Sequence, residues 1–151
     1  MQIEFPSYEF QWRESAGVRM IRDPLRRRYV AITPEEWVRQ HLLRYMLETC
    51  GYPASRMSVE KKLTLNGMTR RADAVVYDRE VHPWMVLECK APEIALNQAV
   101  LDQAAGYNTV LKAPYLAVCN GTELLLAQVD VLNGQRRFLQ HWPNWPEAPS
   151  W

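Results

Sequence analysis

Hydrophobic and polar positions follow two different periods along this chain, and the changes of period divide it into predicted elements. Between Trp37 and Met46 the apolar residues recur at helical spacing, and the segment before them, TPEE at 33–36, is typical of a helix start. Thr33 can accept hydrogen bonds from free amides, and Glu36 stands where a capping-box carboxylate belongs. The sequence therefore predicts a helix that begins directly after Thr33 and stops before Gly51.

Three Asn-Gly pairs lie between alternating runs and predict β-hairpins, because these residues tolerate the positive φ of a tight turn. The pairs are Asn66-Gly67, Asn120-Gly121 and Asn133-Gly134. The strands expected around them are Val59–Leu65 with Met68–Tyr77, Tyr115–Cys119 with Glu123–Val131, and this last strand with Arg136–Gln140. A further strand is expected at Trp84–Lys90, and a second helix from about Ile94 to Leu111. This order predicts an α/β sandwich around a mixed central sheet.

The two ends of the chain carry weaker patterns. Residues 1–30 contain short alternating stretches broken by Gly17 and Pro24, which predicts an N-terminal arm or edge strands. Residues 142–151 are rich in proline and tryptophan, and we expect an extended tail that packs on the domain. We find no dividing linker, and 151 residues suffice for one core, so we expect a single domain over residues 1–151.

Composition narrows the class of protein. Apolar residues make up 48% of the chain and charged residues 23%, which excludes a disordered protein. No apolar run approaches the roughly 18 residues of a membrane span, and the first residues lack the layout of a signal peptide. Three cysteines without a C-x-x-C pair favour a reduced, cytoplasmic protein. With a net charge of +1, any contact with nucleic acid must depend on local basic patches.

Two acidic residues interrupt strands that are otherwise apolar. If residues 79–82 form a loop, Asp73 lies opposite Glu88 on one face, with Cβ atoms roughly 4.5–5.5 Å apart. A slip of one residue would separate them. Opposed carboxylates repel each other unless a hard cation such as Mg²⁺ or Mn²⁺ lies between them, and Lys90 brings an ammonium to the same face. A metal ion, a water molecule and an ammonium are the groups needed to hydrolyse a phosphodiester bond. The alternative is a solvated surface, on which Arg71 and Lys90 neutralise the two carboxylates.

These residues resemble a known arrangement. Asp73, followed at a strand end by Glu88-Cys89-Lys90, is similar to the PD-(D/E)XK nuclease superfamily, with Ala72 in place of its proline. More narrowly, four segments resemble the N-terminal nuclease domain of type I restriction enzyme R subunits: TPEEWVRQ at 33–40, LNG at 65–67, RAD at 71–73 and LECKAP at 87–92. The resemblance covers about residues 23–139. It implies a restriction-endonuclease-like core, in which helices flank a mixed central β-sheet in the order α-β-β-β-α-β, with additional C-terminal hairpin strands.

The same resemblance implies roles for individual residues. Asp73 and Glu88 would hold Mg²⁺ or Mn²⁺, and Lys90 would activate or position water. The glutamate of the family's first helix corresponds to Glu35 or Glu36. We prefer Glu36 as an added metal contact, although a helix-capping role accounts for it equally well.

The second predicted helix adds a separate point. Leu96, Val100, Gln103 and Tyr107 fall on one helical face, which we expect to pack on the sheet, and a glutamine there needs hydrogen-bond partners. Relatives in the superfamily carry a Gln-x-x-x-Tyr motif near the scissile phosphate, and residues 103–107 match it. The resemblance thus implies that Gln103 and Tyr107 order the site. Without it, a half-exposed glutamine beside a core tyrosine explains the pattern as well.

The leading hypothesis is a small stand-alone nuclease, related to restriction or DNA defence, that hydrolyses DNA phosphodiester bonds with Mg²⁺ or Mn²⁺. The backbone of its DNA partner would contact Arg26, Arg27, Arg28, Arg70 and Arg71. The sequence contains no Walker loop, so we expect no translocating motor. We expect instead that the protein forms a homodimer or binds a partner protein that supplies targeting or motor function. The alternatives are a non-catalytic DNA-binding or assembly module with the same fold, and a structural adaptor that uses the tail.

Overall fold

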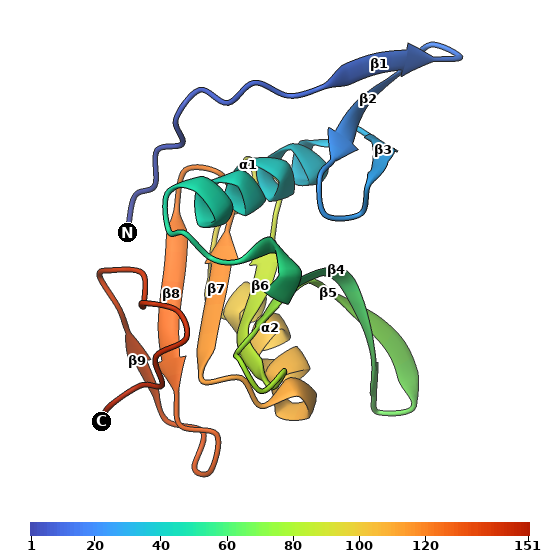
Figure 1. The fold of residues 1–151 in the computed structure, drawn as a ribbon. Coiled ribbons are helices and arrows are strands. Elements are labelled where there is room, and N and C mark those ends of the chain that lie inside the picture. Colours follow the sequence, from blue (N-terminus) through green and yellow to red (C-terminus); the bar gives the residue numbers. More distant parts are fainter.

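Six strands form the central sheet of the computed structural model, which describes residues 1–151 (Figure 1). In spatial order they are β4 (Met57–Leu65), β5 (Met68–Tyr77), β6 (Pro83–Cys89), β7 (Tyr115–Cys119), β8 (Leu124–Val129) and β9 (Arg136–Phe138). β6 and β7 run parallel, and every other neighbouring pair is antiparallel. The sheet is therefore mixed, as the sequence predicts.

Two helices cover opposite faces of this sheet. α1 (Pro34–Glu48) begins as predicted, because the Thr33 side chain accepts a hydrogen bond from the backbone N–H of Glu36 at 3.0 Å. α2 (Gln98–Leu111) begins four residues later than predicted, because Asn97 is its cap and accepts from the backbone N–H of Val100. A short 3₁₀ turn, Ala54–Arg56, leads from α1 into β4. Neither α1 nor α2 has the length and apolarity that a membrane span requires.

The core has two layers, one under each helix. The α1 layer joins helix residues such as Leu42 and Met46 to sheet residues such as Leu87. The α2 layer is built from Leu101, Ala104 and Tyr107 of the helix and Val75, Val86, Leu116 and Val118 of the sheet. The buried face of α2 is thus centred on Leu101 and Ala104. The expectation that Gln103 packs on the sheet is wrong, because the structure leaves it exposed at the border of this face.

The three predicted hairpins are confirmed. In the first, Leu65 pairs with Met68, and Asn66 and Gly67 both adopt positive φ, at 52° and 73°. Between β5 and β6, Val75 pairs with Val86, which is the register expected if residues 79–82 form a loop, and a bulge after Val76 sets Tyr77 opposite Pro83.

The N-terminal region is both an arm and a separate sheet. Residues before Trp12 run extended across α1, and the first of them bond to β8, where Gln2 bridges to Glu123 (Figure 1). Three antiparallel strands follow: β1 (Trp12–Ser15), β2 (Val18–Asp23) and β3 (Arg28–Ala31). These strands form their own sheet and are not edge strands of the central one.

The C-terminal tail packs on the domain, as predicted. Trp142 and Trp145 lie against the α1 layer of the core. The Trp145 ring N–H donates to the carbonyl of Tyr77 at 2.8 Å. Trp151 remains 52% exposed. Two of the three tail tryptophans therefore serve the fold, which weakens the hypothesis that the tail is an adaptor surface.

Candidate functional site

Two buried carboxylates lie where β5 and β6 run side by side. Asp73 is 8% exposed and Glu88 is 4% exposed. The backbone N–H of Cys89 donates to Oδ2 of Asp73 at 2.7 Å, which holds this carboxylate beside the residue that follows Glu88. The predicted juxtaposition depends on the register between Ala74 and Leu87, and the structure has that register.

Asp73 is reached from both sides of the sheet. The pairing of β4 with β5 is interrupted opposite Asp73, at Glu60, whose φ is 54°. The Asp73 carboxylate therefore contacts Arg39 of α1, whereas strict alternation predicts that it faces α2 together with Glu88. The irregular pairing explains how one aspartate meets groups from both layers.

Lys90 connects the carboxylates to α2. Its Nζ lies 3.3 Å from Oε1 of Glu88 and donates to Oε1 of Gln103 at 2.8 Å. The Gln103 amide donates in turn to the Tyr107 hydroxyl at 3.4 Å. The structure thus brings together Asp73 and the four other residues assigned a catalytic role from the sequence.

The solvated-surface alternative does not fit this geometry. Both carboxylates are buried, and Arg71 does not neutralise either of them. Its guanidinium lies 3.9 Å from Glu60 instead. Lys90 does pair with Glu88, as that alternative required, but in a setting from which most water is excluded.

Burial raises the pKa of both carboxyl groups. For Glu88 the pKa rises to about 8, because burial and the nearby Asp73 charge both disfavour ionisation, while Lys90 opposes the rise. Burial also raises the pKa of Asp73, against the Cys89 N–H and Arg39, which favour its charged form. Asp73 therefore disfavours the ionisation of Glu88, whereas a side-chain hydrogen bond from Glu88 favours the charged form of Asp73.

A hard cation fits this pair of carboxylates. The Oε2 atom of Glu88 is buried without a hydrogen-bond partner, next to a second carboxylate, and such oxygens are the ligands that Mg²⁺ and Mn²⁺ prefer. No group of three or more His, Cys, Asp or Glu side chains gathers in a metal-binding arrangement. The donor set offered by the protein is thus Asp73 and Glu88, and Mg²⁺ bound by one or two carboxylates takes water as its remaining ligands.

The thermal stability of the metal-free protein should contain a component that falls as pH rises from about 5 to 8. Between the ordinary pKa of 4.5 and the folded value of about 8, the native state holds a proton on Glu88 that the unfolded state has lost. Glu88→Gln removes this titration and should raise Tm at pH 8 by on the order of 5 °C. Thermal unfolding in EDTA across this range measures the difference between the two proteins. A difference that is independent of pH would contradict the raised pKa.

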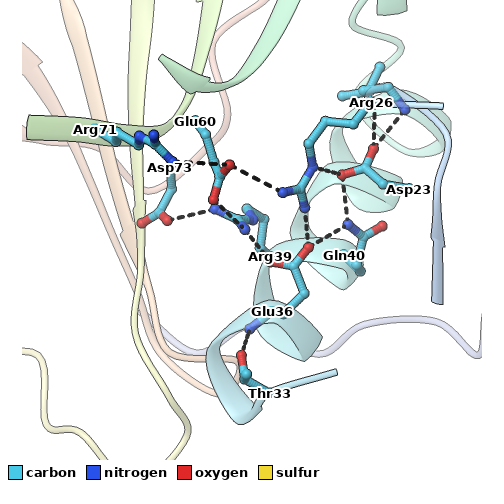
Figure 2. A network of polar contacts seen from close by, with 10 residues as sticks. Asp23, Arg26, Thr33, Glu36, Arg39, Gln40, Glu60, Arg71 and Asp73 are labelled. Carbon is cyan, nitrogen blue, oxygen red and sulfur yellow. Dashed lines mark hydrogen bonds and ion pairs between the residues drawn. The ribbon is translucent and has the colours of Figure 1, made fainter. Parts of the chain in front are cut away.

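A second polar cluster lies on the α1 side of Asp73, as Figure 2 shows. Arg39 donates to Oδ1 of Asp73 at 3.0 Å and forms an ion pair with Glu36. The Glu60 carboxylate lies 3.5 Å from the same guanidinium. Arg39 is 8% exposed, and its neighbours Glu36 and Asp73 raise its pKa although burial opposes them. Three carboxylates therefore surround the positive charge of Arg39.

Arg26 extends this cluster to the turn between β2 and β3 (Figure 2). It pairs with Asp23 at 2.7 Å and also with Glu36, and it lies 3.5 Å from Glu60. Its side chain is only 12% exposed. Carboxylates thus already surround the guanidinium that was predicted to contact DNA phosphates, which argues against that role.

The other four arginines predicted to bind DNA are exposed at the surface. Arg27 and Arg28 lie at the β2–β3 turn, and Arg70 and Arg71 lie on β5 near the first hairpin. They are free to meet a phosphate backbone, but they belong to two separate elements.

The structure favours Glu35 over Glu36 as the helical glutamate of the site. The Glu36 carboxylate is occupied by Arg26 and Arg39, so it neither completes a capping box nor is free for a metal. Glu35 and Glu36 both line a pocket of about 500 Å³ together with Asp73, but only Glu36 is held by the two arginines. Burial and the charge of Asp73 raise the pKa of Glu35. Both assignments stay predictions, and the ion pairs of Glu36 make Glu35 the better candidate.

Sequence reasoning missed the arginine that contacts Asp73. Glu36 and Arg39 are three residues apart on a helix, a spacing that predicts an ion pair. No local pattern, however, connects Arg39 to Asp73 or to Glu60, because the contacts depend on how α1 lies across the sheet.

Comparison with known proteins places the chain in a family. The sequence profile described as type I restriction enzyme R protein N terminus (HSDR_N) matches residues 34–143. The fold is similar to a fragment described as a putative HsdR subunit of a type I restriction enzyme from Vibrio vulnificus YJ016, with a TM-score of 0.54 and 20% identity. This match covers 75% of the present chain but only 24% of the other, so the chain spans about a quarter of that fragment. No curated protein matches the sequence. Because the profile covers most of the chain, and the fold agrees with it, the protein belongs to the family of type I restriction enzyme R protein N termini, as its motifs predicted.

Proposed function

We propose that the protein is a metal-dependent nuclease that hydrolyses DNA phosphodiester bonds in restriction or DNA defence. One observation carries the proposal: two buried carboxylates converge beside an ammonium, with Nζ of Lys90 3.3 Å from Oε1 of Glu88. Folding alone gives no reason to bury two like charges together. The family to which the chain belongs supports the restriction context.

Each residue of the site has a task in this proposal. Asp73 and Glu88 would hold Mg²⁺ or Mn²⁺, and the metal would supply a bound water of lowered pKa and a Lewis acid for a phosphate oxygen. The Lys90 ammonium has three donors, of which two are directed to Glu88 and Gln103, so one is free for water or for a phosphate oxygen. Gln103 holds that ammonium, and the Tyr107 hydroxyl accepts from Gln103 and fixes its orientation.

DNA and a further protein are the proposed partners. Arg27, Arg28, Arg70 and Arg71 would contact backbone phosphates, which gives binding that weakens with salt and is largely independent of sequence. The type I restriction family supports partnership with other subunits, and we propose that a second copy or another subunit supplies targeting or motor function. A cytoplasmic location stays a prediction.

A cleavage assay tests the proposal. Purified protein is incubated with duplex and single-stranded DNA in Mg²⁺, in Mn²⁺ and in EDTA. We expect cleavage only with a metal, and none above background for Glu88→Gln. Glu80→Gln makes the same chemical change at an exposed loop position and should cleave like the wild type. Cleavage that persists in EDTA, or that Glu88→Gln retains, would refute the proposal.

A second candidate function is a non-catalytic DNA-binding or assembly module. The observation in its favour is that both oxygens of Asp73 already have partners, Arg39 and the Cys89 N–H. In that case the buried carboxylates serve the ion-pair cluster alone. DNA binding without cleavage, and without any effect of Mn²⁺ on Tm, would favour this function.

A further inference from the structure

Aromatic rings gather on the surface where the N-terminal arm and β1 cross α1. Trp12 stacks on Trp37, with ring centroids 5.9 Å apart and planes inclined by 28°. Phe10 lies 6.1 Å from each of these rings, and His41 lies 4.1 Å from Trp37. We call these four residues the aromatic shelf. Trp12 and Trp37 remain 42% and 39% exposed, so the shelf presents large ring surfaces to solvent.

Positive charge is concentrated beside the shelf. Residues 12–31 contain six arginines and two acidic residues, a formal charge of +4, although the whole chain carries +1 and the remaining residues therefore sum to −3. Of the two acids, Asp23 is buried against Arg26. The Arg19 guanidinium lies 5.4 Å from the Trp12 ring, and the Arg13 guanidinium lies 4.2 Å from the Tyr29 ring.

The shelf borders the carboxylate site. The pocket that contains Asp73 is lined by Glu36 of α1 and by Ala91 of the loop after β6. A second hollow, of about 190 Å³, is lined by the next residue of each element, Trp37 and Pro92. Consecutive residues on two elements thus line both hollows, so the shelf lies beside the pocket that contains Asp73.

We propose that the aromatic shelf binds the unpaired bases of single-stranded DNA, with the arginines of β1 and β2 on its backbone. Bases of any sequence stack on exposed aromatic rings, and a local excess of arginine suits a polyanion. Tryptophan and arginine are also enriched at protein–protein contacts, so binding to a second protein is one outcome of the test below. The proposal depends on the proposed nuclease function in one respect only, which is that the bound strand leads to the carboxylate site. The family profile begins at residue 34, so Phe10 and Trp12 lie outside the matched domain.

Fluorescence anisotropy of a labelled 20-nucleotide strand, measured on the full chain in EDTA, tests the shelf without requiring cleavage. Trp12→Ala and Trp37→Ala should each weaken single-strand binding roughly 5- to 100-fold and change duplex binding by less than about twofold. Trp12→Phe keeps a ring and should retain most of the affinity. Trp151→Ala is the matched control, because Trp151 is 52% exposed with an arginine 5.3 Å from its ring, but it lies in the tail.

A strand of the same length without bases separates stacking from charge. It should bind the wild type and the two alanine variants equally. Equal affinity of wild type and variants for the normal strand would overturn the proposal. It would also be overturned if the alanine variants lost affinity equally for the normal strand, the duplex and the baseless strand. A change in self-association instead of strand binding would overturn it too and assign the surface to a protein partner. Single-strand binding that depends on the two tryptophans, without any metal-dependent cleavage, would support the shelf and refute the nuclease function. Metal-dependent cleavage without tryptophan-dependent binding would refute the shelf alone.

Discussion

Lys90→Ala is expected to cleave DNA at least about 100-fold more slowly than the wild-type protein while keeping its fold. The variant loses the one ammonium placed 3.3 Å from Glu88, and with it the donor available for water or phosphate. Its stability at neutral pH should change little, because the Glu88 carboxyl, with its pKa raised to about 8, is protonated there without a metal and leaves no unpaired charge. Single-turnover rates at saturating Mn²⁺ measure the effect.

Two comparisons isolate the role of this ammonium. Lys112→Ala removes an exposed lysine after α2, and it should cleave at the wild-type rate. Lys90→Ala should still bind Mn²⁺, since Asp73 and Glu88 remain. Cleavage by Lys90→Ala at the wild-type rate would show that the lysine has no part in the chemistry.

Arg39→Leu is expected to lower the free energy of unfolding by about 3–5 kcal/mol, because it leaves buried carboxylates without their counter-charge. The guanidinium contacts Asp73 at 3.0 Å and pairs with Glu36, and both acids are buried. Urea unfolding at pH 7 measures the change. Arg71→Ala provides the control from the same cluster, and its exposed pair with Glu60 at 3.9 Å should be worth less than about 1 kcal/mol.

The Arg39 effect should depend on its acidic partner. In a double variant that combines Arg39→Leu with Asp73→Asn, the introduced amide carries no charge to leave unpaired, so the two changes should together cost less than the sum of their separate effects. Strict additivity, or a loss below about 1 kcal/mol for Arg39→Leu alone, would mean that the cluster of Figure 2 does not stabilise the fold.

Local chemistry explains which parts of the fold the sequence predicts. Thr33 caps α1 through its own hydroxyl, and the turn at Asn66 needs only two residues that accept positive φ. The bulge that moves Tyr77 opposite Pro83 follows from no such signal. The sequence pattern places the start of α2 too early because residues from Ile94 onward are apolar enough to continue the helical period, whereas Asn97 makes the cap.

The candidate site divides in the same way. Strand alternation and the pairing of Val75 with Val86 suffice to predict that Asp73 and Glu88 lie close together. The resemblance to known nucleases adds Gln103 and Tyr107 of α2. The choice between Glu35 and Glu36 depends on the rotation of α1 over the sheet, which a helical pattern does not determine. The burial of Arg26 depends in turn on Glu60, which lies 34 residues away.

Titration of Mn²⁺ into the metal-free protein by calorimetry tests the central claim most directly. The account predicts a binding site in the wild-type protein that Asp73→Asn and Glu88→Gln each remove and that Glu80→Gln leaves intact. Absence of binding to the wild type, or binding that survives both substitutions at the buried carboxylates, would contradict it.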